Sequence, residues 1–178
     1  MEELPDNILK LFRNAGWFEA RAVSLEKRLP DGFGSYPTEY INLMSRFWGL
    51  TVENRGKFKF KIFSKVHKGE FSNRIIFNPM FAEGLNTIDH GEELDYMYYS
   101  SIIGRQLYPV GITHEEWHIA LDESLTLYIF HIGYGCLKLH DNPFEGFRCI
   151  LENDMYTTVY ELCEHENNFG EWFKRPQV

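Results

Sequence analysis

The chain has 178 residues, of which 44% are hydrophobic and 25% are charged, as in ordinary globular domains. The net charge of −8 argues against a general nucleic-acid binder, whose surface is basic, so we expect no direct nucleic-acid partner. We also expect a cytoplasmic protein with no membrane partner, since the sequence shows no apolar run of membrane-spanning length, no signal peptide and no C-x-x-C pair among its three cysteines.

Two helices are predicted in the first third of the chain, over residues 4–14 and 37–48. Each has a proline near its start and a glycine after its end, where helices favour these residues. Each also has an apolar stripe at helical spacing. The stripe residues are Ile8, Leu11 and Phe12 in the first helix and Tyr40, Leu43, Met44 and Phe47 in the second.

Alternating apolar and basic residues predict strands in the middle of the chain. In residues 57–66, lysines alternate with phenylalanine and isoleucine, and a turn at Lys68-Gly69 leads to a second strand over residues 70–77. We interpret the lysine face as a solvated strand face that protects a sheet edge from aggregation, and not as a stripe for nucleic acid.

A third helix is predicted over residues 92–104, followed by an extended segment over 107–111. Residues 116–121 and 125–132 alternate with a period of two and predict a hairpin, with its turn at 122–124. The apolar side of the third helix is predicted to hold Leu94, Met97, Tyr98 and Ile102.

The last part of the chain predicts further helices. Pro143 opens a helix that runs to about Leu151. From about residue 153 the chain becomes acidic, and apolar residues among the acids allow one more helix near 159–163. This order of elements predicts a single α+β domain over residues 1–178, with a largely antiparallel central sheet flanked by helices.

Residues 114–118 spell H-E-x-x-H, a short motif of zinc hydrolases. On a helix, His114 and His118 lie one turn apart and can share a zinc ion, while Glu115 deprotonates a zinc-bound water. The flanking alternation instead indicates strands, in which the two imidazoles lie roughly 13 Å apart at about 3.3 Å per residue. No third ligand stands at a familiar spacing. We therefore expect no metal, no cofactor and no catalytic residue, with a small zinc hydrolase as the alternative.

Four segments, in this order, resemble motifs of the third subgroup of the SUKH superfamily. Residues 15–21 resemble its A-G-W-x-x-x-R signature, and residues 77–82 resemble its F-(D/N)-P-x-x-A stretch. Residues 104–111 resemble its G-x-x-L-x-P-(V/I)-G segment. Residues 121–128 resemble its (I/L)-D-E-x-G-x-(V/I)-Y strand and turn, except that Leu125 stands where the family has glycine.

The resemblance runs from about residue 8 to residue 152, and the acidic tail lies outside it. SUKH proteins are mostly bacterial immunity proteins, each encoded beside a toxin of a polymorphic toxin system. The resemblance therefore implies a cytoplasmic inhibitor that binds the C-terminal domain of a secreted or contact-delivered toxin, often a nuclease. A basic nuclease fits the acidic charge of this chain, because opposite charges speed association.

Tight inhibition also needs aromatic anchors that become desolvated on binding. The candidate toxin-binding residues are aromatic or acidic: Tyr96, Tyr98, Tyr99, Glu115, Glu116, Trp117, Glu171 and Trp172. Trp17 belongs to the signature and is expected in the core. A regulatory interaction module with the same fold is a further alternative to the toxin inhibitor.

Overall fold

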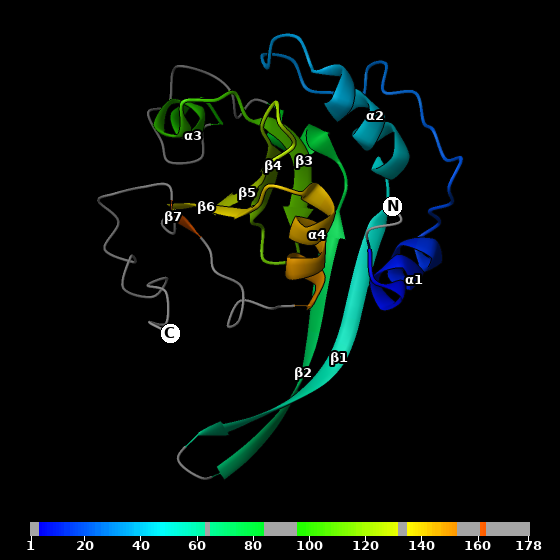
Figure 1. The fold of residues 1–178 in the computed structure, drawn as a ribbon, viewed down its shortest axis with the longest axis vertical. Helices are drawn as coiled ribbons and strands as arrows, with labels where there is room; N and C mark the ends of the chain where they lie inside the picture. The colour runs from blue at the N-terminus through cyan, green and yellow to red at the C-terminus, as the bar shows by residue number, and fades with distance from the viewer. Residues whose placement is uncertain (1–3, 63–64, 84–95, 132–134, 153–160, 163–178) are drawn as a thin grey trace.

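A seven-stranded antiparallel sheet forms the centre of the computed structural model, which describes residues 4–62, 65–83, 96–131, 135–152 and 161–162. The strands are neighbours in space in the order in which they occur in the chain (Figure 1). Their bounds are β1 (Thr51–Ile62), β2 (Lys65–Ile76), β3 (Tyr108–Thr113), β4 (His118–Leu121), β5 (Leu127–His131), β6 (Gly135–His140) and β7 (Glu161–Leu162).

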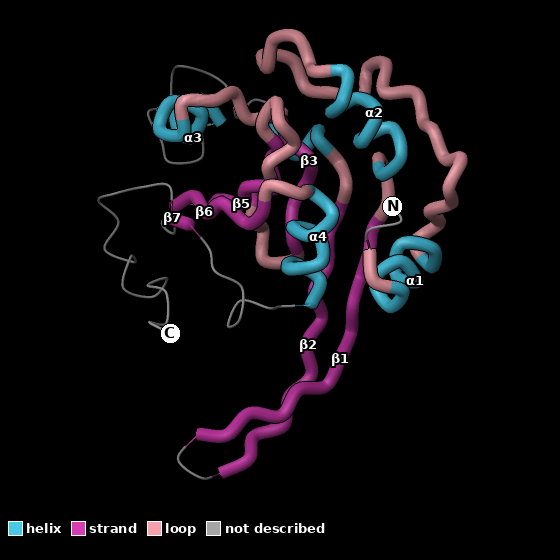
Figure 2. Tube along the Cα trace, in the orientation of Figure 1, coloured by secondary structure: helices cyan, strands magenta, loops and turns pink. Residues whose placement is uncertain are grey.

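Helices flank this sheet, so the predicted α+β class is confirmed (Figure 2). They are α1 (Asp6–Asn14), α2 (Thr38–Phe47), α3 (Tyr96–Ile103), α4 (Pro143–Glu152) and the 3-10 helix η1 (Pro79–Ala82). None of the helices in the described ranges has the length and apolar character needed to cross a membrane.

Helices α3 and α4 cover opposite faces of the sheet. Phe130 of β5 contacts the rings of Tyr96 and Tyr99 on α3, with centroids 4.8 Å apart in both pairs. Leu127, three residues earlier, packs against Gly146 of α4, where an added Cβ would lie 3.0 Å from the Leu127 Cβ. Residues three apart in a strand point to opposite faces, which places the two helices on either side of β5.

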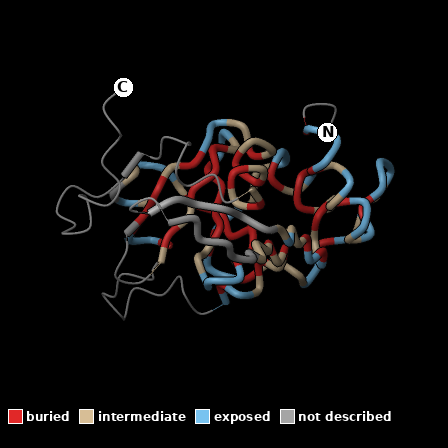
Figure 3. Tube along the Cα trace, turned by 90° about the horizontal axis from the view of Figure 1, so that it is seen from below, coloured by how far each residue is buried: buried red, intermediate tan, exposed pale blue. Residues whose placement is uncertain are grey.

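Four phenylalanine rings join three helices to the sheet. Phe12 of α1, Phe47 of α2, Phe77 after β2 and Phe147 of α4 are fully buried, and all six pairs of ring centroids are 5.1–6.4 Å apart. All four residues belong to the buried core. Figure 3 shows the buried segments gathered in the interior of the molecule. Edge-on, tilted and stacked contacts of this kind stabilise the fold beyond the burial of the rings themselves.

The C-terminal end of α4 is held by two amides from the sheet. The side chains of Asn54 and Asn73, which are register partners in β1 and β2, both donate to the Leu151 carbonyl, at 3.0 and 3.1 Å. Carbonyls in the last turn of a helix have no partner within it, so these bonds fix α4 across the two strands.

The strands β1 and β2 form a ribbon that is longer than the rest of the sheet. They pair over their whole length, whereas β2 pairs with β3 only at Ile75 and Ile76 (Figure 1). The turn predicted at Lys68-Gly69 is wrong, because Lys68 pairs with Lys59 and Gly69 pairs with Phe58 inside the ribbon. The side chains of residues 57–71 lie outside the description, so the predicted lysine face stays a prediction.

Three other predicted details are wrong. The inward side of α3 holds Tyr96 and Tyr99, while Met97 and Tyr98 are 39% and 43% exposed. Strand β6 was not predicted. The helix predicted near 159–163 is contradicted at residues 161–162, which form the short strand β7 beside β6. The other residues of that segment lie outside the described set. So do Leu94, which precedes α3, and the side chain of Ile102.

The close approach of β2 and β3 at Gly111 predicts a strong effect of one added methyl group. At Gly111, an added Cβ would lie 1.9 Å from the backbone carbonyl oxygen of Ile76, with φ at +156°. Gly111→Ala must therefore push the two strands apart and should lower the free energy of unfolding by about 3 kcal/mol. Urea denaturation followed by circular dichroism measures this loss.

Gly34→Ala is the control for this substitution. Gly34 also has positive φ, +70°, but has no other atom within 4 Å of an added Cβ. Its substitution should cost about 1 kcal/mol, from backbone strain alone. Equal losses for the two variants would show that the approach of β2 to β3 is not the tight contact described above.

Candidate functional site

The H-E-x-x-H segment forms the turn between β3 and β4. The Thr113 N–H donates to the Trp117 carbonyl at 2.9 Å, and the Trp117 N–H donates to the Thr113 hydroxyl at 3.2 Å. Glu116 takes a positive φ of +63° to complete the turn. His118 is the first residue of β4, so the predicted strand context is confirmed and the helix that a zinc motif requires is not formed here.

The two histidines of the motif lie in different surroundings. His114 is exposed. His118 stacks on Phe130 with ring centroids 5.3 Å apart, and its Nδ1 lies 3.4 Å from the Tyr96 hydroxyl under α3. Burial, with a smaller effect from His131, lowers the pKa of His118 to about 4. Within the described ranges, no group of three His, Cys, Asp or Glu side chains is placed to hold a metal ion.

A pocket opens beside this turn, on the face of the sheet that α4 covers. Apolar side chains from β5, β6 and α4 form part of its lining, and polar side chains from the ends of β2 and β3 complete it. The Nε of Arg74, one of the lining residues, is buried without an acceptor among the described residues. The lining residues are Asn73, Arg74, Thr113, His114, Glu115, Trp117, Ile129, Leu137, Leu139, Cys149 and Ile150.

The sequence signals found only three of the eleven residues that line this pocket. His114, Glu115 and Trp117 were singled out by the motif or by residue type, but Arg74 and the apolar residues of β6 and α4 were not. Strand β6 was missing from the predicted elements, so nothing in the sequence placed it beside the turn. The approach of β2 to the same turn shows in one backbone contact, the His114 N–H donating to the Arg74 carbonyl at 3.1 Å.

The predicted toxin-binding residues divide by exposure. Glu115 and Glu116 are exposed in the turn, Trp117 is half-buried between them and the pocket, and Tyr98 is 43% exposed on α3. The contact of Tyr96 with His118 shows that the first turn of α3 adjoins the β3–β4 end of the sheet.

Two of the predicted tyrosines lie in the core. Tyr96 and Tyr99 are fully buried against Phe130, so their side chains are not available at the surface. We leave both out of the proposed contact residues. Glu171 and Trp172 lie outside the described residues.

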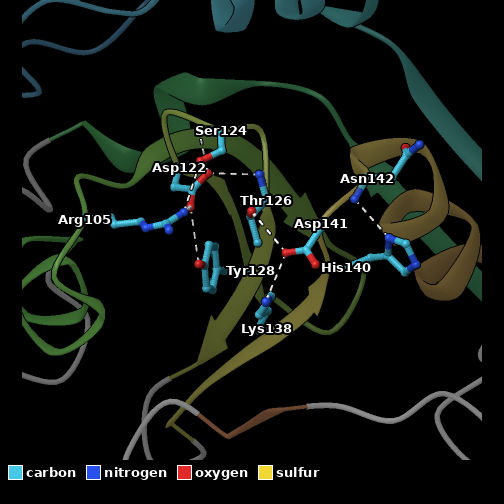
Figure 4. Close-up of polar contacts among 9 residues, drawn as sticks. All are labelled: Arg105, Asp122, Ser124, Thr126, Tyr128, Lys138, His140, Asp141 and Asn142. Atoms are coloured by element: carbon cyan, nitrogen blue, oxygen red, sulfur yellow. Dashed lines mark hydrogen bonds and ion pairs between the residues drawn. The ribbon is translucent and has the colours of Figure 1, made fainter.

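At the opposite end of β4, a buried carboxylate organises the turn into β5 (Figure 4). One oxygen of Asp122 accepts from the backbone N–H groups of Ser124 and Thr126, at 2.8 and 3.0 Å. The other oxygen accepts from Arg105 at 2.8 Å and from the Tyr128 hydroxyl at 3.4 Å. The carboxylate is fully buried, while the Arg105 side chain is 54% exposed.

Leu125 lies inside the loop that Asp122 holds and has φ of +64°. Its N–H donates to the Asp122 carbonyl at 3.0 Å. A left-handed conformation is strained for leucine and unstrained for glycine. Leu125 therefore forms this turn at the cost of backbone strain that a glycine would not have.

A second set of polar contacts connects this turn to the start of α4 (Figure 4). Asp141 accepts from the Thr126 hydroxyl at 3.4 Å and pairs with Lys138 at 3.0 Å. Asn142 caps α4, since its side-chain oxygen accepts from the Phe144 N–H at 2.9 Å. The β4–β5 turn and α4 are thus fixed to the same end of β6.

Asp122→Ala should destabilise the protein more than Arg105→Ala. Removal of the carboxylate leaves the backbone N–H groups of Ser124 and Thr126 without their acceptor, the second of them in the interior, and should cost about 3 kcal/mol. Removal of Arg105 leaves the carboxylate with its backbone donors and removes only a solvent-exposed partner, so it should cost less. Chemical denaturation of both variants measures the difference, and a larger loss for Arg105→Ala would contradict this account of the turn.

The low pKa of His118 predicts a stability that falls with acidification. The unfolded chain holds this imidazole near its ordinary value of 6.5, so as the pH falls it takes up the proton before the folded protein does. Between about pH 7 and pH 5, this group should lower the free energy of unfolding by about 2 kcal/mol. His118→Gln should remove that part of the pH dependence.

Urea denaturation of wild type and His118→Gln at both pH values measures this effect. His114→Gln is the control, because it makes the same change of residue at an exposed position. Equal pH dependence in the wild type and His118→Gln would contradict the burial of His118.

A scan against protein-family models gives no match, and searches among curated proteins and solved structures give none either.

Proposed function

We propose that this protein is a cytoplasmic immunity protein of the SUKH type, which binds a toxin domain and blocks it without catalysis of its own. The partner is the C-terminal domain of a toxin encoded beside its gene. A basic nuclease is the class that fits the net charge of −8, since nuclease surfaces carry cations for phosphate.

The observation that carries the proposal is the placement of the four family-like segments. Each contains a residue that connects two elements of the fold or starts a turn or helix. Arg21 donates to the Arg46 and Trp48 carbonyls after α2, at 2.7 Å each. Asn78 accepts from the Met80 N–H and starts η1. The third segment supplies Gly111, where β2 and β3 approach each other closely, and the fourth supplies Asp122 in the β4–β5 turn. Motif residues with such roles support a shared fold, and so support the resemblance.

The proposed binding surface is the β3–β4 turn with Glu115 and Glu116, together with the pocket beside it. Two exposed carboxylates give the turn a charge that attracts a basic partner over long range. Trp117 is half-buried and lines the pocket, a position in which an aromatic ring becomes desolvated when a partner covers it. The pocket can receive one side chain of the partner between the ring and α4.

Reversal of the charge of the turn tests the surface. The double variant Glu115→Lys/Glu116→Lys should bind the toxin domain encoded beside the gene roughly a hundredfold more weakly and should fail to protect co-expressing cells. The control is Glu39→Lys/Glu83→Lys, which makes the same change of charge at exposed positions on α2 and after η1.

Titration calorimetry at two salt concentrations measures both affinities. Equal losses in the two double variants would show that the total charge matters and the turn does not. Absence of any binding by the wild type, together with absence of protection, would overturn the immunity proposal itself.

A further inference from the structure

Five side chains around the C-terminal end of α2 form a continuous group of arginines and tryptophans. We call Trp17, Arg21, Arg28, Arg46 and Trp48 the Arg–Trp cluster. It contains the tryptophan and the arginine of the A-G-W-x-x-x-R segment, and it lies away from the turn and pocket proposed for the toxin.

Ring contacts and hydrogen bonds connect every member of the cluster. The Arg46 guanidinium lies over the Trp17 ring, 5.7 Å from its centroid, and the Arg28 guanidinium lies over the Trp48 ring, 4.2 Å from its centroid. Arg21 joins the two pairs, since its guanidinium donates to the carbonyls of both Arg46 and Trp48. The three cations are therefore held at one place on the molecule.

No carboxylate neutralises these cations within the described chain. The five ion pairs found there involve Arg55, Arg105, Lys138 and Arg148, and none includes a member of the cluster. Glu19, Glu26 and Asp31, the acids in the same loop, are exposed and form no ion pair with it among the described residues. All three arginines are half-buried, and burial lowers the pKa of Arg21. The cluster thus holds partly desolvated positive charge on a protein whose net charge is negative.

The cluster also has donors that lack acceptors. The indole N–H of Trp17, the indole N–H of Trp48 and the Nε–H of Arg46 are buried without a hydrogen-bond partner among the described residues. Trp17 is only 6% exposed. Buried polar groups in folded proteins are almost always paired, and all three of these are donors. What is missing is an acceptor, and next to three cations the favoured acceptor is an anion.

We infer that the Arg–Trp cluster binds a phosphate group, either as free phosphate or on a small phosphate ester. A tetrahedral oxyanion accepts several hydrogen bonds at once and matches the forked donors of arginine. Both indole rings are already covered by a guanidinium on one face, so the cluster offers hydrogen bonds and charge, not a platform for base stacking. A buried water would satisfy the donors but would leave the three positive charges unbalanced.

Indole N–H resonances provide a direct test with internal controls. Inorganic phosphate is titrated into the ¹⁵N-labelled full chain at constant ionic strength, with chloride as the exchanged anion. The Trp17 and Trp48 signals should shift together and saturate, with a Kd of ~1 mM or lower, while the Trp117 signal should not move. Glycerol phosphate gives the same shifts if an ester is accepted, and phosphate alone gives them if it is not.

Variants separate a built site from general attraction. Arg28→Gln, which leaves the Trp17–Arg46 pair untouched, should weaken phosphate binding roughly tenfold. Arg55→Gln removes one cation from an exposed position of β1 and should leave binding unchanged. Arg46→Lys keeps the charge but removes the buried Nε–H, and should also weaken binding.

Three results would overturn the inference. One is the absence of a saturable shift, which would assign the donors to buried water. The second is equal weakening by Arg28→Gln and Arg55→Gln, which would show a response to total charge. The third is an equal shift with chloride alone. Each is independent of the toxin, so failure here leaves the proposed function standing.

Discussion

The buried carboxylate of Asp122 is the contact on which the order of the central sheet depends. Asp122 lies just after β4, and one of its oxygens accepts hydrogen bonds from the two backbone N–H groups in the turn to β5. The same carboxylate connects this turn to Arg105 after α3 and to Tyr128 in β5. One side chain therefore connects the end of α3 to two strands, and an apolar residue of the same size would leave these donors without their acceptor.

Elements with a strong local signal could be predicted from the sequence, and elements defined by their neighbours could not. Helices α1, α2 and α4 have prolines at their starts, and the hairpin β4–β5 has clear alternation, so all four were found. Strand β6 carries one lysine within an apolar run and no β-branched residue, so it resembles a strand only beside β5. The turn between β1 and β2 was predicted at the wrong residues, because alternation shows that a strand exists but not where it ends.

The prediction of the inward face of α3 was wrong for a different reason. Helical spacing counted from Leu94 placed Met97 and Tyr98 on the buried side. The structure buries Tyr96 and Tyr99, since Phe130 and His118 offer them ring contacts and a polar partner for the Tyr96 hydroxyl. Because Tyr96 and Tyr99 are buried, these two predicted toxin-binding residues are not available to a partner. Glu115 and Glu116 were placed correctly at the surface, because a short acidic stretch beside a strand favours a turn.

The length of the β1–β2 ribbon has a consequence for how the molecule opens. From Asn73 back to Lys65, the backbone hydrogen bonds of β2 within the described chain run to β1 alone. A two-stranded ribbon is marginally stable on its own, so its far part can separate without disturbing the phenylalanine core. Amide hydrogen exchange should therefore detect two levels of protection along single strands, low towards residues 62 and 65 and high where α4 rests on Asn54 and Asn73.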